Sequence, residues 1–261
     1  MIKKSMWLLL LIGAGCALAF AEEQAVMPTG LVKLEDARYP VALLVPENYS
    51  VKQAYPLLVT IPSEGASPED ALSAWQSFSK RRSLIVLAPS NLRPEDLPTG
   101  MDAWILKIIG EVRERYKVDK DSIYLVGEGG GAHYAAYLAV QHPESFSAVA
   151  LIGAAWKGRY GELIRIKKHP SEQLPFLLYA PADQPGLAGA LTEEAYAFEK
   201  KGYPVTVSQV GSAPELLKVD FRKKLFESLE AKSRDWRDFR AAHSKSFKEQ
   251  VRAGVKQFFT V

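Results

Sequence analysis

Short runs of apolar and β-branched residues recur along the chain, and they constrain its fold more than any other feature. Strands buried on both faces of a sheet have this composition. The runs occupy residues 57–61, 84–87, 123–126, 148–152, 176–179 and 205–207. Segments with apolar residues at helical spacing lie between most of these runs, so strand and helix alternate. The pattern predicts an α/β fold with a doubly wound, mostly parallel sheet and helices on both faces.

Local signals refine this prediction at two places. Residues 67–70 read Ser-Pro-Glu-Asp, with a Ser suited to the N-cap, a Pro at the first helical position and an acid at the third. A helix is therefore expected to begin there and to carry Leu72, Trp75 and Phe78 on one face. Residues 32–45 are extended in character and end at Pro46, so we expect one or two antiparallel strands at the sheet edge.

The first 21 residues predict a cleavable signal peptide. Lys3 and Lys4 precede an apolar stretch over residues 6–20, and small residues follow at the end of that stretch. A retained N-terminal anchor is one alternative. A lipoprotein site at Cys16 is another, although the position that is Leu in such sites is Gly13 here. We expect an exported protein, periplasmic or secreted, with no transmembrane span in the mature chain because no second long apolar run follows.

Charge and cysteine content narrow the classes of partner. The chain has 33 Lys and Arg against 30 Asp and Glu, a net charge of +3, which is too small to favour a nucleic-acid surface. Its single cysteine, Cys16, leaves with the signal peptide, which excludes a disulfide in the mature chain. No pair of histidines has a metal-ligand spacing, so we expect no metal and no cofactor. Residues 22–261 are expected to form one domain, with a charged helical segment at about 215–240.

The sharpest predicted strand-to-helix turn covers residues 127–132, Gly-Glu-Gly-Gly-Gly-Ala. Ligands of doubly wound sheets bind at such turns. Gly127, Gly129 and Ala132 satisfy the loose dinucleotide fingerprint G-x-G-x-x-A. Two observations oppose a nucleotide site: the turn does not belong to the first strand–helix unit of the chain, and no acid ends the next strand at Ile152.

A family resemblance gives this turn a different interpretation. Residues 122–131, the helical segment 135–139 and the sequence His-Pro-Glu-Ser-Phe at 142–146 resemble the nucleophile elbow of the α/β-hydrolase family. The resemblance is greatest to secreted poly(3-hydroxybutyrate) depolymerases and feruloyl esterases, and it covers about 55–259. The family motif G-x-S-x-G has its nucleophilic Ser where this chain has Gly129. Glycine tolerates the positive φ of that position, so the resemblance implies a preserved turn without its nucleophile.

The other family positions are partly matched. Asp183 follows Tyr179-Ala180-Pro181-Ala182, where the family has H-G-x-x-D, so the resemblance implies the acid of a catalytic triad. A loop Asp that caps the next helix is the alternative. Ser63, Glu64 and Gly65 fall in the region of the family's oxyanion loop, and Gly65 alone clearly matches it. With Glu128 and Gly130, these residues form the predicted binding site.

A triad base is harder to place. The family's histidine would follow the last strand, but residues 211–215 read Gly-Ser-Ala-Pro-Glu. His243 is the candidate, just before a helical period that starts near Phe247, which would make residues 215–240 an insertion. The remaining histidines, His133, His142 and His169, are interpreted as surface residues, and the same interpretation is open for His243.

Three functional hypotheses follow. The first, which we favour, is an exported, catalytically inactive α/β-hydrolase-fold protein that binds a small-molecule or acyl-type ligand or a protein partner. The second is a carboxylic ester hydrolase with Ser63 or a Glu128-activated water in place of the missing nucleophile, and with Asp183 and His243 as acid and base. The third is a protein-docking surface on residues 218–256, which requires Trp236 and Phe239 to lie outside the core. The mixed charges of that segment also fit a solvated helical face.

Overall fold

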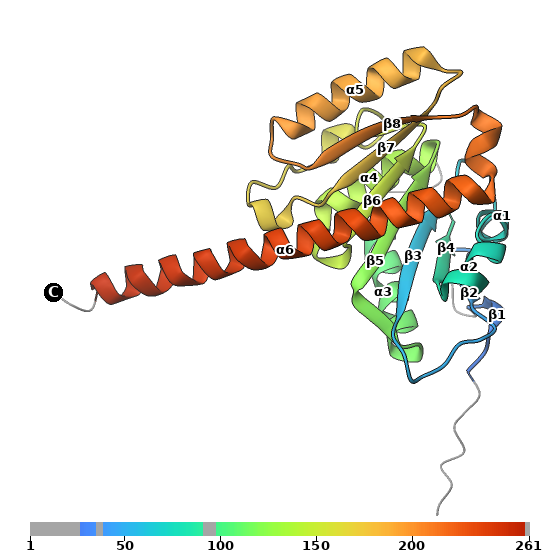
Figure 1. The fold of residues 1–261 in the computed structure, drawn as a ribbon, viewed down its shortest axis with the longest axis horizontal. Helices are drawn as coiled ribbons and strands as arrows, with labels where there is room; N and C mark the ends of the chain where they lie inside the picture. Colours follow the sequence, from blue (N-terminus) through green and yellow to red (C-terminus); the bar gives the residue numbers. More distant parts are fainter. Residues whose placement is uncertain (1–26, 35–38, 91–97, 259–261) are drawn as a thin grey trace, which may run out of the picture.

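The computed structural model describes residues 27–34, 39–90 and 98–258, and within these it describes no side chain after Ala242. The predicted signal peptide, residues 1–21, lies outside the described residues, as does the alternative site at Cys16. The described chain forms one eight-stranded sheet in the spatial order β1-β2-β4-β3-β5-β6-β7-β8 (Figure 1). The strands are β1 (Gly30–Lys33), β2 (Val41–Val45), β3 (Tyr55–Ile61), β4 (Ile85–Pro89), β5 (Val118–Glu128), β6 (Ala148–Ile152), β7 (Phe176–Pro181) and β8 (Val205–Val210).

The strand directions confirm the predicted sheet. Strands β3 to β8 pair in parallel, whereas β1 pairs antiparallel with β2 and β2 antiparallel with β4. Each apolar run found in the sequence coincides with a strand, although Leu84 lies just before β4, and the edge pair overlaps the extended segment, with β1 beginning at Gly30. The chain moves from β3 out to β4 and then back past β3 to β5. The order reverses between β3 and β5, and their carboxyl ends therefore mark the point where such folds bind ligands.

The helices alternate with the strands as expected, with one difference. Ser67 caps α1 and accepts a hydrogen bond from the Asp70 amide, and the Asp70 side chain completes the capping box. The single helix predicted over Leu72, Trp75 and Phe78 is two helices, because the chain turns at Ala74 and Trp75. The helices are α1 (Pro68–Ser73), α2 (Gln76–Arg82), α3 (Pro98–Arg115), α4 (Gly130–Gln141), α5 (Pro185–Glu199) and α6 (Val219–Phe258), with short 3-10 turns η1 (Pro143–Ser145), η2 (Gly161–Leu163), η3 (Pro170–Glu172) and η4 (Ala213–Leu217).

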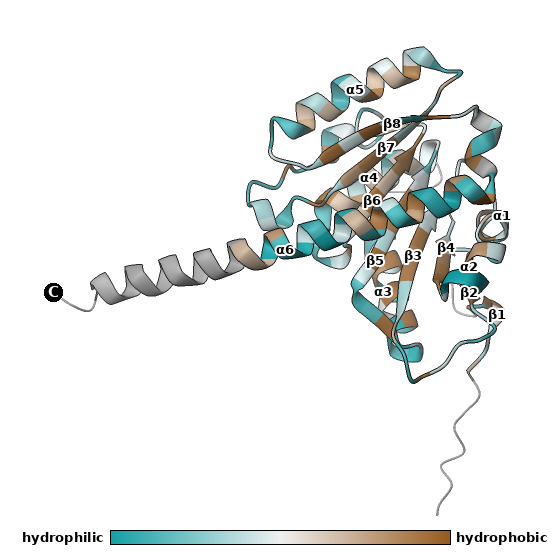
Figure 2. Ribbon diagram, in the orientation of Figure 1, coloured by the Kyte–Doolittle hydropathy of each residue, from teal (hydrophilic) through white to brown (hydrophobic). Residues whose placement is uncertain are grey.

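Two apolar cores form on opposite faces of the sheet because strand side chains alternate in direction. Leu57 and Val59 of β3 belong to the core that includes residues of α3, α4 and α5, whereas Leu58 belongs to the core that includes residues of α1, α2 and the first part of α6. The apolar colouring is concentrated in the strands between these layers (Figure 2). Burial on both faces explains why the strands read as continuous apolar runs in the sequence.

Helix α6 is the longest element of the described chain, at 40 residues. It crosses one face of the sheet, and its C-terminal half projects beyond the other elements (Figure 1). Trp236 on α6 is buried and Phe239 is exposed, so the condition that both lie outside the core is not met. Among the described helices, none combines the length and apolarity that a membrane span requires.

Candidate functional site

The turn between β5 and α4 has the backbone conformation expected of an elbow. Gly129 has φ 53° and ψ −125°, a region that glycine occupies with little strain. Its amide donates a hydrogen bond to the carbonyl oxygen of Ile152 at 2.8 Å, and its own carbonyl accepts one from the Ala132 amide at 3.0 Å. These bonds fix the turn at the carboxyl edge of the sheet, next to β3.

The loop between β3 and α1 lies directly over the glycines that follow this turn. A Cβ atom on Gly129 would lie 2.8 Å from the Ser63 hydroxyl oxygen, and one on Gly130 would lie 2.8 Å from Cγ of Glu64. A Cβ on Gly131 would lie 2.3 Å from the carbonyl oxygen of Pro62. Gly131 is therefore required by the approach of the β3–α1 backbone, whereas a side chain at 129 or 130 would have to move the side chain of Ser63 or Glu64.

Ser63 is held in this position by a hydrogen bond to the end of β5. Its hydroxyl donates to the carbonyl oxygen of Glu128 at 3.2 Å. Gly65 follows with φ 80°, which lets the loop turn away toward α1. The structure thus places Ser63 and Glu64 beside Gly129 and Gly130. Their role in binding a ligand stays a prediction.

Glu128 points to the face of the sheet that α6 covers. It follows Tyr124 and Val126 in the alternation of β5, and both of those side chains belong to the core beneath α6. Its carboxylate forms an ion pair with Arg222 of α6, with an Nη1–Oε1 distance of 2.5 Å. The Arg222 side chain is 1% exposed, and its guanidinium lies 5.0 Å from the centre of the Trp75 ring. A buried charge therefore connects the elbow to α6.

Sequence analysis did not identify Arg222. The sequence did contain a signal for this residue, because Arg222 lies between Phe221 and Leu225 on the apolar face of α6. An arginine on such a face needs a buried acid as its partner. The identity of that acid was not readable, because Glu128 is 94 residues away in the sequence.

Asp183 lies in the turn between β7 and α5, at the same edge of the sheet as the elbow, and it is exposed. The neighbouring amide of Ala182 donates to carbonyl oxygens of the β8 end, Val210 and Gly211, at 2.9 and 2.7 Å. The position agrees with that of a triad acid in the resemblance. Its role as an acid stays a prediction.

The predicted base, His243, lies inside a helix. α6 is continuous from Val219 to Phe258, so His243 does not precede a separate final helix, and residues 215–240 are not an insertion before one. The reason is that no Gly or Pro interrupts residues 219–253. The His243 side chain lies outside the described residues.

The other histidines all have polar neighbours; His169 is exposed as predicted, whereas His133 and His142 are half-buried. Nδ1 of His133 lies 2.9 Å from the Ala155 carbonyl oxygen, and Nδ1 of His169 lies 2.6 Å from the Ser171 hydroxyl. His142 is half-buried, with Nε2 3.5 Å from a carboxylate oxygen of Asp102. The hydrogen bond to Asp102 raises the pKa of His142. Within the described chain, no group of three or more acids, histidines or cysteines is placed to hold a metal ion.

Comparison with solved structures identifies the fold. A ferulic acid esterase superposes on 79% of this chain and 99% of its own, with a TM-score of 0.59 and 13% identity. The S-formylglutathione hydrolase of Staphylococcus aureus covers 78% of this chain and 98% of its own, with a TM-score of 0.57 and 10% identity. A thermostable esterase has 18% identity and a TM-score of 0.52 over 79% of this chain, which spans 61% of that protein. The fold is α/β-hydrolase-like.

The likeness extends to the fold alone at these identities. No family model and no curated protein matches the sequence. In an α/β-hydrolase-like fold, the residue at the strand-to-helix elbow is the nucleophile of the active members. Here that residue is Gly129, which has no side chain, and the β3–α1 loop occupies the space beside it.

Proposed function

We propose that this protein is an exported, catalytically inactive member of the α/β-hydrolase fold that acts by binding a small acyl-type ligand or a protein partner. Formation of an acyl-enzyme by the family route needs an oxygen or sulfur nucleophile at the elbow. Gly129 offers none. The connection from β8 to α6 also contains no histidine at residues 211–218.

One observation carries the proposal. The side chains of Ser63 and Glu64 fill the space where side chains on Gly129 and Gly130 would stand, at contact distances of 2.8 Å. A nucleophile at 129 would have to displace the Ser63 hydroxyl from its bond to the Glu128 carbonyl. The missing nucleophile and the close approach of the β3–α1 loop are thus consistent with each other. Both are expected of a turn that keeps its backbone conformation without a catalytic role.

The position of Ser63 also favours a second candidate, a carboxylic ester hydrolase. Its hydroxyl stands beside the nucleophile position and is a candidate replacement. In that case Asp183 and His243 would act as acid and base. The variant of this candidate that uses a Glu128-activated water has less support, because Arg222 already engages that carboxylate.

Labelling by a fluorophosphonate, which reacts with activated serines, separates the candidates. We expect no labelling of the wild-type protein and none of Gly129→Ser, even when Ser63→Gly is added to make room, because no base activates the new serine. Wild-type labelling that is lost in Ser63→Ala would overturn the proposal in favour of the hydrolase. Ser73→Ala is the matched control, since Ser73 is an exposed serine on α1 that bonds only to the Asp70 carbonyl.

A further inference from the structure

A groove of about 700 Å³ lies at the opposite edge of the sheet from the elbow. Helices α3 and α6 bound the groove. The amino end of β5 and the residues just before β6 complete its lining. Ile109 and Ile123 are buried and Leu106 is half-buried, and they give the groove an apolar surface. The volume is in the range of small-molecule sites.

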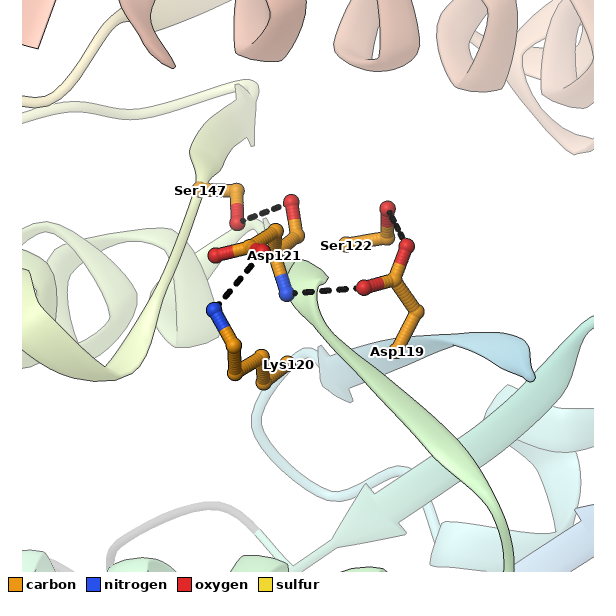
Figure 3. Close-up of polar contacts among 5 residues, drawn as sticks. All are labelled: Asp119, Lys120, Asp121, Ser122 and Ser147. Carbon is orange, nitrogen blue, oxygen red and sulfur yellow. Dashed lines mark hydrogen bonds and ion pairs between the residues drawn. The ribbon is translucent and has the colours of Figure 1, made fainter. Parts of the chain in front are cut away.

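Cationic side chains dominate the polar lining. Arg113 on α3 and Arg237 and Arg240 on α6 line the groove together with Lys120, against the acids Asp121 and Glu144. Both acids already have partners. The Lys120 ammonium lies 2.8 Å from the Asp121 carboxylate (Figure 3), and Nδ1 of His142 lies 3.7 Å from the Glu144 carboxylate.

The arginines lack such partners. Among the described residues, no carboxylate lies within ion-pair distance of Arg113, Arg237 or Arg240. Arg240 lies over the ring of Trp236, 5.0 Å from its centre, and this contact leaves its charge unneutralised. The groove therefore carries an excess of positive charge beside an apolar surface.

The wall of the groove at the start of β5 is fixed by side-chain hydrogen bonds. The Asp119 carboxylate accepts bonds from the Asp121 amide at 3.0 Å and from the Ser122 hydroxyl at 2.7 Å (Figure 3). The Ser147 hydroxyl donates to the Asp121 carbonyl at 2.9 Å and joins this wall to the chain before β6. The lining is preorganised on this side, which reduces the entropy lost when a ligand binds.

A glycine keeps the groove open. Gly110 lies inside α3, where glycine weakens a helix. A Cβ atom there would meet nothing within 4 Å, so no packing contact requires a glycine at this position. A larger side chain would project into the groove that Gly110 lines.

We propose that this groove binds an anionic amphiphile, a small molecule with an acidic head group and an apolar body. Guanidinium groups bind carboxylate, sulfonate and phosphate oxygens with two parallel hydrogen bonds. Leu106, Ile109 and Ile123 contact the apolar body. The inference stands apart from the proposed function, since it uses the amino edge of the sheet and no residue of the elbow.

Two fluorescent probes that differ only in charge test the proposal. 1-Anilinonaphthalene-8-sulfonate carries a sulfonate, and N-phenyl-1-naphthylamine is the same ring system without it. We expect the wild-type protein to bind one sulfonate probe per chain, about tenfold or more tighter than the neutral probe, with affinity that falls as salt is added. Laurate should displace the bound probe.

Variants locate the site. Arg237→Gln and Arg113→Gln should each weaken the sulfonate probe about tenfold and leave the neutral probe unchanged. Gly110→Leu should abolish binding of both probes while favouring the helix, so a loss does not report unfolding. Arg234→Gln is the matched control, because Arg234 lies on α6 one turn from Arg237, is exposed and does not line the groove.

Several outcomes would overturn the inference. Equal affinity for the two probes would remove the role of charge. Binding that survives Gly110→Leu, or that falls equally in Arg234→Gln and Arg237→Gln, would place the probe elsewhere. Displacement by penta-glutamate as effective as by laurate would make the groove a site for an acidic peptide. Each of these results leaves the labelling experiment at the elbow untouched, so the two proposals fail independently.

Discussion

Glycines mark two regions at opposite edges of the sheet, and their surroundings are opposite. At the carboxyl edge, Cβ atoms on Gly129, Gly130 and Gly131 would meet the β3–α1 loop at 2.3 to 2.8 Å. At the amino edge, a Cβ on Gly110 would meet nothing within 4 Å. The first set lies against the loop, whereas Gly110 leaves space beside arginines that have no carboxylate partner among the described residues. The β3–α1 loop thus packs closely on the elbow, whereas the groove at the amino edge is open beside Gly110.

The arginines of the two regions differ in the same way. Arg222 is buried and paired with Glu128, whereas the arginines of the groove are exposed or half-buried and have no carboxylate partner in the part of the chain that the structure describes. A buried ion pair contributes mainly through the penalty for breaking it, whereas an exposed charge contributes little to stability. The buried pair is therefore expected to contribute to the stability of the elbow region, and the exposed cations of the groove are expected to contribute little to stability.

The largest expected effect comes from breaking the buried pair. Arg222→Met leaves the Glu128 carboxylate without its cation and should lower the free energy of unfolding by about 3–5 kcal/mol. Arg113→Met, the matched change in the groove, should alter it by less than about 0.5 kcal/mol. Urea denaturation followed by circular dichroism measures both. Similar losses in the two variants would erase the difference between the regions.

The pair should also show coupling. In Arg222→Met with Glu128→Gln, the uncompensated charge is gone, so the double variant should lose less stability than the sum of the single variants. Strict additivity would show that Arg222 stabilises the fold only by packing on Trp75.

A smaller loss is expected where the elbow glycines meet the loop. Gly131→Ala places a methyl group against the Pro62 carbonyl oxygen and the Ile61 carbonyl oxygen, 2.3 and 2.6 Å away. Both are backbone atoms that cannot rotate aside, so we expect a loss of about 1–3 kcal/mol in the free energy of unfolding. An unchanged urea midpoint would show that the loop moves freely and that the elbow is not closed.

Gly110→Ala should have the opposite sign. The position is helical and its Cβ meets no neighbour, so alanine should raise the free energy of unfolding by about 1 kcal/mol. Thermal unfolding of the wild type, Gly110→Ala and Gly131→Ala side by side provides the comparison. Destabilisation by Gly110→Ala would indicate that the groove is narrower than its lining implies.

The sheet could be predicted well from the sequence and the site only in part. The sheet gives local sequence signals, whereas the site depends on contacts between residues that are far apart in the sequence. The strands are readable because burial on both faces leaves a local apolar signature, and the start of α1 is readable because its capping box spans residues 67–70. The contact of Ser63 with Glu128 joins residues 65 apart, and no local pattern encodes it. Sequence analysis placed both residues in one site only through the family resemblance.

The failure at His243 has a different cause. Sequence analysis ended one helix near Arg240 and began another near Phe247, although the intervening residues contain neither Gly nor Pro. A charged stretch does not end a helix, and α6 continues through it. Arg222 was missed because the charged segment was considered only as a docking surface or a solvated face, whereas its first turns pack against the sheet.

The smallest expected effect concerns pH and the rim of the groove. The hydrogen bond to Asp102 raises the pKa of His142, Glu144 adds to the increase, and Lys167 and burial oppose it. A histidine whose pKa is higher in the folded state stabilises the folded state at pH values below its unfolded pKa. This contribution disappears as pH rises through the folded pKa.

The free energy of unfolding of the wild type relative to His142→Gln should thus be greater at pH 5.5 than at pH 8, by less than about 1 kcal/mol. His169→Gln, at an exposed histidine, serves as the control. A difference that grows with rising pH would mean that His142 is buried in its neutral form, and Glu144 would then lack a cationic partner at the groove.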